Sequence, residues 1–362
     1  MTDTPFMKAF SGEADAASRL EPALRPGGAA SGFGSGAPRV SRRNLFALAG
    51  GAVLAGLAAR PALAAEGDAD VYVVTNRKPV EGAEERPWFS WQRSGGTRVV
   101  RAVLKDGGKS LLGKAVSTVT GRWSLLRVEG LGPNDPVATL VGAVAGQDLL
   151  FYVHGYKTSF ETSVLDAHEL ASGIDFEGQT VAFSWPSKDA LIDYGYDRES
   201  AMWSRDALQD VFEALGRNPA GGKLNIIAHS MGALLTLETL RQLWALSGST
   251  DLAARIGAIV LAAPDIDVDL FATSLKRIGP LASHITVIGS TKDRALAVSG
   301  QLAGGVSRVG ASVRAQLEPL GVKVVDASDY GWGVIGHDVF LSNKDVRAVV
   351  RRAIDRGARA QD

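Results

Sequence analysis

The stretch 224–235, which reads LNIIAHSMGALL, constrains the fold more than any other part of the chain. A short apolar run leads into AHSMG at 228–232, and a helical pattern of apolar residues begins at once. A strand, a sharp turn and a helix in this order form a nucleophile elbow, which exposes a serine hydroxyl. The strained turn requires small neighbours, and Ala228 and Gly232 are small. The pattern therefore predicts a nucleophilic Ser230, and the alternative is a serine that only caps the helix.

A serine hydroxyl needs a base to take its proton, and this base is usually histidine. The chain contains five histidines, of which His284 and His337 follow Ser230. In hydrolases with such an elbow the order along the chain is Ser, acid, His. His284 opens an expected strand, whereas His337 lies in the Gly-rich loop GWGVIGHD after the last one. We therefore expect His337 to be the base.

Two carboxylates compete for the third position, which orients the histidine and stabilises its charged form. Asp293 ends GSTKD after the expected strand 284–288, and Asp265 lies in APDID after the strand 256–262. Both loops fall at the carboxyl edge of the expected sheet, where active sites form. Asp293 is favoured because the acid most often follows the later strand. Asp265 is the alternative, and either residue could instead cap the next helix.

An oxyanion hole requires two backbone N–H groups that point at the developing negative charge. One candidate is the amide of Met231, directly after the serine. The other comes from HGY after the expected strand 149–153, where Gly155 or Tyr156 would donate. Gly155 lets the backbone approach a substrate closely.

From residue 149 onward, apolar strands alternate with helical segments, which predicts an α/β fold. The near-continuous apolar strands indicate a mostly parallel sheet with helices on both faces. The expected strands are 71–74, 97–104, edge strands near 123–128 and 138–144, then 149–153, 180–185, 224–228, 256–262, 284–288 and 322–325. The expected helices are 159–172, 198–215, 232–247 and 344–356, with an irregular or helical stretch at 268–278. Residues 296–320 form either a cap over the site or a crossover.

Residues 1–64 are typical of an export signal with a disordered leader. The pair Arg42-Arg43 precedes a weakly apolar run, and Ala62-Leu63-Ala64 offers a cleavage site. This arrangement resembles a bacterial twin-arginine signal. The apolar run is too short and too rich in glycine for a comfortable membrane span, and an uncleaved anchor is the alternative interpretation. We expect the protein to be exported to the periplasm or secreted, without a stable membrane span after cleavage, and residues 68–362 to form one domain.

Composition narrows the chemistry further. The absence of cysteine excludes disulfides, thiolate catalysis and Cys-ligated zinc. The formal net charge is 0, and the part after the signal is slightly acidic, which argues against nucleic acid as a partner.

Several stretches together resemble one largely uncharacterised bacterial α/β-hydrolase family of the esterase/lipase superfamily. The similarity covers about residues 70–345 and follows the family's order of motifs. The stretches are TNRKP (75–79), FYVHGYKTSFE (151–161), FSWPSK (183–188), YGYDRESAMWS (194–204), IIAHSMG (226–232), LAAPDID (261–267), TKDRAL (291–296) and the loop of His337. The resemblance implies the α/β-hydrolase fold, with Ser230, an Asp and His337 as a triad. It implies no particular substrate.

The expected function is cleavage of a carboxylic ester or thioester in a small acyl substrate through an acyl-Ser230 intermediate. His337 would serve as base and then acid, oriented by Asp293, and this chemistry needs neither a metal nor a cofactor. Acyl transfer by the same triad is one alternative. The other is a secreted binding module that kept the fold without turnover.

Overall fold

The computed structural model describes residues 68–82, 87–107, 123–132, 135–188, 193–248, 250–312, 314–329 and 339–359. All of them belong to one compact unit, Pro61–Asp362. The expected export signal and the candidate base His337 lie outside the described residues. Both stay predictions.

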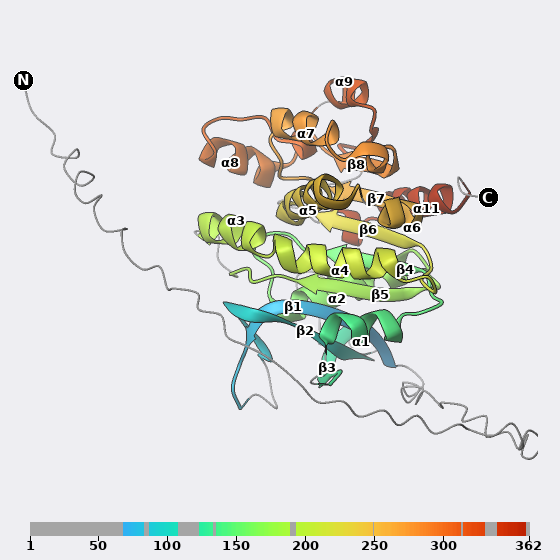
Figure 1. The fold of residues 1–362 in the computed structure, drawn as a ribbon. Helices are drawn as coiled ribbons and strands as arrows, with labels where there is room; N and C mark the ends of the chain where they lie inside the picture. Colours follow the sequence, from blue (N-terminus) through green and yellow to red (C-terminus); the bar gives the residue numbers. More distant parts are fainter. Residues whose placement is uncertain are drawn as a thin grey trace, which may run out of the picture. The chain divides into compact units, whose positions relative to one another are not determined.

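The described strands form one nine-stranded sheet in the order β3-β2-β1-β5-β4-β6-β7-β8-β9 (Figure 1). Only β2 among them runs against the others, because β1 and β3 pair with it in antiparallel fashion and every other pair is parallel. The strands are β1 (Asp68–Pro79), β2 (Phe89–Asp106), β3 (Trp123–Gly130), β4 (Leu149–Val153), β5 (Gln179–Ser184), β6 (Leu224–His229), β7 (Ile256–Ala262), β8 (Ile285–Gly289) and β9 (Lys323–Asp326).

Helices cover both faces of the sheet. The α-helices are α1 (Pro136–Ala143), α2 (Phe160–Gly173), α3 (Tyr194–Trp203), α4 (Arg205–Arg217), α5 (Met231–Ser247), α6 (Thr250–Arg255), α7 (Val268–Leu275), α8 (Arg294–Leu302), α9 (Arg314–Leu317), α10 (Val339–Ser342) and α11 (Lys344–Arg359), and short 3-10 helices span Gly279–His284, Val309–Ala311 and Glu318–Leu320. Residues from α1, α4, α5 and α7 share the core on one face, and those from α2, α10 and α11 share the core on the other. In Figure 1, α4 and α5 lie in front of the sheet and α2 lies behind it.

The strands are buried on both faces, which explains their continuous apolar sequences. In β4, Phe151 packs against Phe212 of α4 with ring centroids 5.1 Å apart. Its neighbour Tyr152 points to the opposite face, where its ring lies 6.4 Å from that of Phe340. This alternation follows from the two-residue period of a strand. The expected α/β architecture, with a mostly parallel sheet between helices, is confirmed.

The expected edge strand at 138–144 is wrong, because this segment is helix α1. Asp135 caps the helix, accepting from Val137 N at 3.0 Å and from Ala138 N at 3.1 Å. Pro136 occupies the first turn, where its fixed φ favours a helix. The expected helix 198–215 is also corrected, since α3 ends and α4 begins at Ser204. The segment 296–320 consists of α8, α9 and short 3-10 turns between β8 and β9.

The start of α5 packs directly onto the end of β4. A Cβ built at Gly232 would lie 2.3 Å from His154 O and 2.6 Å from Val153 O. Both are backbone atoms, which cannot move aside as a flexible side chain could. Gly232 therefore sets how closely helix α5 approaches the strand beside β6.

We predict that Gly232→Ala destabilises the fold by about 3 kcal/mol, at the upper end of typical overpacking costs. Gly142→Ala is the matched control, because Gly142 lies in helix α1 with no heavy atom within 4 Å of a built Cβ. That control should gain about 0.5–1 kcal/mol through helix propensity. Urea unfolding of both variants measures the difference. Equal stabilities would contradict the close-approach account.

Candidate active site

Ser230 lies at the carboxyl end of β6 in a strained turn. Its backbone has φ 51° and ψ −118°, a conformation that residues other than Gly rarely adopt. The amide of Ser230 donates to Ala262 O at 2.9 Å, and Asp265 N donates to Ser230 O at 3.1 Å. These bonds to the end of β7 and the loop after it hold the turn in place.

The capping alternative for Ser230 can be examined directly. The residue occupies the position before α5, yet its side chain makes no capping hydrogen bond to the helix. The residue is 2 % exposed. This geometry does not use the hydroxyl as a helix cap, and it places the hydroxyl at the positive end of α5.

The loop after β4 lies against this serine. A Cβ built at Gly155 would be 3.0 Å from Ser230 Cβ and 2.8 Å from His229 Nδ1. Tyr156, the next residue, packs edge-on against Tyr194 with centroids 5.6 Å apart. Met231 is the first residue of α5 and is buried. The structure thus brings Gly155 and Met231, two of the expected oxyanion-hole residues, next to Ser230.

The described histidines differ in position. His284 lies just before β8, where its Nδ1 is 3.4 Å from Gly257 O near the start of β7. That is the amino edge of the sheet, opposite Ser230. His168 packs edge-on against Trp123 at 4.3 Å and is half-buried. His229 lies 4.8 Å from the ring of Phe340.

His154 is fully buried beside the site. Its ring stacks on Trp185 at 4.7 Å, with Nδ1 2.8 Å from Gly155 O and Nε2 3.1 Å from Trp185 O. Arg77 Nη2 lies 3.5 Å from Nε2. Burial and then the Arg77 charge lower the pKa of His154 well below its usual range.

Asp265, the alternative acid, belongs to a buried polar cluster. Arg308 Nε lies 3.0 Å from Asp265 Oδ1, and these side chains are 2 % and 3 % exposed. Tyr194 OH donates to Oδ2 at 2.8 Å, and Ser299 Oγ donates to Oδ1. Asp265 therefore has a cation and two hydroxyl donors around its carboxylate. It does not cap α7, because Asp267 does so by accepting from Leu270 N at 2.9 Å.

Asp293, the favoured acid, follows β8 and is buried. Its Oδ1 accepts from Leu296 N at 3.0 Å, so the residue caps α8. The capping role that was the alternative interpretation is therefore present. A carboxylate has about four acceptor positions, so a capping bond does not by itself prevent a second partner. Capping and orienting a histidine are compatible.

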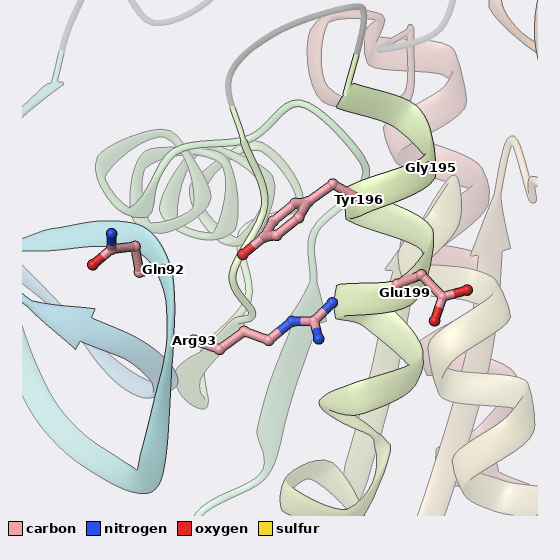
Figure 2. A pocket seen from close by; sticks show the side chains of 5 residues that line it. All are labelled: Gln92, Arg93, Gly195, Tyr196 and Glu199. Atoms are coloured by element: carbon pink, nitrogen blue, oxygen red, sulfur yellow. The ribbon is translucent and has the colours of Figure 1, made fainter.

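A pocket of about 560 Å³ lies between β2 and α3 (Figure 2). Gln92 and Arg93 line it from β2, and Tyr196 and Glu199 line it from α3. Arg93 pairs in register with Arg77 at the end of β1, which places the pocket at the same sheet edge as Ser230. Ser230 is not among its lining residues.

The described ranges contain no cluster of three or more potential metal ligands. Within the same ranges, no helix combines the length and apolarity needed to cross a bilayer.

The neutral state of His154 predicts a pH-dependent stability. In the unfolded chain His154 takes up a proton below its ordinary pKa of about 6.5, whereas the folded protein resists it, so stability falls as the pH drops. The loss from this site is at most about 1.4 kcal/mol per pH unit. We therefore expect the free energy of unfolding of the unaltered protein to fall relative to that of His154→Gln as the pH is lowered from 7 to 5. Urea unfolding measures both. A constant difference would show that the pKa of His154 is not depressed.

Comparison with known proteins supplies the family. A 63-residue stretch is 38% identical to an uncharacterized protein of Nostoc sp., covering 17% of this chain and 16% of that protein. A predicted CIB-like hydrolase of Thermoplasma acidophilum shares 16% identity at a TM-score of 0.34, covering 71% of this chain and 91% of that one. Est1E of Butyrivibrio proteoclasticus shares 11% identity at a TM-score of 0.38, covering 72% and 96%. Residues 136–353, more than half of the chain, match the family described as "Alpha/beta hydrolase of unknown function (DUF900)", and the chain therefore belongs to this alpha/beta-hydrolase family.

Proposed function

We propose that the protein is a serine hydrolase that cleaves a carboxylic ester or thioester in a small acyl substrate. The observation that carries the proposal is the strained turn of Ser230 with Gly155 packed against it. A positive φ at a serine costs roughly 1–3 kcal/mol. Such strain persists where the surrounding structure enforces it, and it is common at active sites. Membership of the alpha/beta-hydrolase family supports the same interpretation.

The proposed chemistry uses His337 as the base. Ser230 Oγ attacks the acyl carbon as its proton passes to His337, and the substrate oxygen becomes an oxyanion. The amides of Met231 and of Gly155 or Tyr156 bind this oxyanion. Collapse of the intermediate expels the leaving group, which receives the proton from His337. Water then attacks the acyl carbon of the acyl-Ser230 ester as His337 takes one of its protons, and collapse of this second intermediate releases the carboxylic acid and Ser230 Oγ, which receives that proton from His337.

The surroundings of the two carboxylates support Asp293 as the orienting acid. Asp265 is paired with the buried Arg308 and held by Tyr194 and Ser299. A carboxylate already paired in this way has little to offer a histidine. Asp293 follows β8, two strands from β6 in the sheet, and in this fold the acid most often follows the later strand.

We predict that Ser230→Ala loses about 10⁵–10⁶ in turnover while keeping its melting temperature, as expected when a triad nucleophile is removed. Ser274→Ala is the matched control, because Ser274 is equally buried but bonds Glu238 on α5. The control should retain turnover. Acyl esters of graded chain length and a fluorophosphonate label provide the two readouts. Retained hydrolysis of every active ester by Ser230→Ala would refute the proposal.

Substitution of the two aspartates by asparagine should have different effects, on turnover at Asp293 and on stability at Asp265. Asn caps a helix about as well as Asp, so Asp293→Asn should keep its stability and lose roughly 10⁴ in turnover. Loss of the negative partner should also lower the pKa of His337, moving the acidic limb of kcat/KM to lower pH.

Asp265→Asn should do the reverse. It leaves Arg308 buried without its anion, which costs about 3–5 kcal/mol of stability, with turnover per folded molecule nearly unchanged. Denaturant unfolding and steady-state kinetics on both variants separate these outcomes. A kinetic loss confined to Asp265→Asn would transfer the role of acid to Asp265.

A further inference from the structure

Four sequence stretches that the triad does not use meet in one buried cluster beside the candidate site. They are 75–79, 151–161, 183–188 and 194–204, and each contributes a polar residue. The cluster consists of Arg77, Thr158, Ser187 and Asp197, with His154 at its border. All five side chains are buried.

Arg77 is the centre of this cluster. Its side chain lies at the end of β1 and is 1 % exposed. The guanidinium donates from Nε to Ser184 Oγ at 3.0 Å, from Nη1 to Ser187 O at 3.1 Å and from Nη2 to Thr158 O at 2.6 Å. One rigid planar group thus joins the ends of β1 and β5 to the loop after β4.

Asp197 also binds the loops after β4 and β5. This residue of α3 accepts from Lys188 N at 2.7 Å, from Lys157 N at 3.0 Å and from Ser187 Oγ. Ser187 Oγ in turn accepts from Thr158 N at 3.1 Å. Burial raises the pKa of Asp197, whereas these donors and the Arg77 charge act in the opposite direction.

The segment held by the cluster is the loop 154–158. Arg77 binds the carbonyl of Thr158, and Asp197 binds the amide of Lys157, whose φ of 59° is itself strained. Gly155 lies two residues before Lys157 and packs against Ser230. The arrangement therefore fixes both the conformation of the loop 154–158 and its position relative to Ser230.

We propose that Arg77 and Asp197 are positioning residues. They hold the loop 154–158 so that the amide of Gly155 or Tyr156 points at the oxyanion. This inference rests on the proposed hydrolase function, since it assigns a role within that site. Neither residue touches the reacting atoms. Their effect is geometric, because an oxyanion donor displaced by about 1 Å can lose roughly 100-fold in rate.

The arginine cannot be replaced by lysine in this role. A lysine ammonium is a compact charge without the planar fork that reaches three acceptors at once. Arg77→Lys keeps the positive charge and removes the fork, so it tests geometry separately from charge. Asp197→Asn keeps the shape but replaces one acceptor oxygen with a donor that faces a backbone N–H. Ser187→Ala is a milder variant, should the other two fail to fold.

Arg101→Lys is the matched control. Arg101 is a buried arginine of β2, the strand next to β1, and its Nε donates to Asp70 Oδ2 at 2.6 Å near the start of β1. It therefore lies toward the sheet edge opposite Ser230. A general effect of disturbing a buried arginine should appear in both variants.

The experiment measures kcat and KM on an acyl ester per active site, with the sites counted by complete fluorophosphonate labelling. A trifluoromethyl ketone is the second probe, because its adduct with serine carries an oxyanion in the hole. We expect Arg77→Lys and Asp197→Asn to lose about 100-fold in kcat per labelled site with little change in KM. The ketone should bind more weakly by a similar factor, Ser187→Ala should lose less, and Arg101→Lys should stay within about threefold of the unaltered protein.

A structural role would reduce the number of labelled sites and leave kcat per site unchanged. The positioning role is overturned if Arg77→Lys and Asp197→Asn keep kcat per labelled site, or if Arg101→Lys loses as much. Failure of the proposed function looks different. In that case the unaltered protein would take up no label at Ser230, and Ser230→Ala would keep its activity.

Discussion

The candidate site depends on one close backbone contact, between the loop after β4 and the first turn of α5. Two glycines permit it. Gly232 brings the helix onto the carbonyls of Val153 and His154, and Gly155 brings the loop onto Ser230. With side chains at these positions, helix and loop would have to separate. Beside this contact, the strained φ of Ser230 is sustained by hydrogen bonds of its amide and its carbonyl to the end of β7 and the loop after it.

Near this contact, two aspartates of the same type differ in their interactions because their surroundings differ. Asp265 and Asp293 are both buried at the carboxyl edge, each after a parallel strand. Asp265 faces the buried cation Arg308, which makes it part of a structural ion pair whose disruption costs stability. Asp293 anchors the start of α8 through one oxygen. The helix that follows β8 thereby fixes the orientation of this carboxylate.

Local sequence signals were sufficient where they were unambiguous. The apolar runs 149–153 and 256–262 match β4 and β7 residue for residue, and the small residues around Ser230 predicted the elbow. The segment 138–144 is a helix and not the expected strand, because its apolar residues fit either period and the capping by Asp135 and Pro136 favours a helix. The pairing of Asp265 could not be foreseen, since Arg308 comes from a distant segment. Arg77 lies in the stretch TNRKP, but its role carried no local signal, because its partners come from the end of β5, the loop after β5 and the loop after β4.

The separation of these partners along the chain also bears on folding. Arg77 meets its acceptors near residues 158 and 187, and β1 pairs with β5 more than a hundred residues later. Contacts of such long range form slowly, because closing a long loop costs entropy before any contact forms. Until β5 and α3 have docked, the guanidinium of Arg77 stays hydrated, and the loop 154–158 has no fixed conformation. The placement of the loop 154–158 beside Ser230 is thus a late event in folding, and a chain that has completed only its local helices and hairpin has the serine without this loop against it.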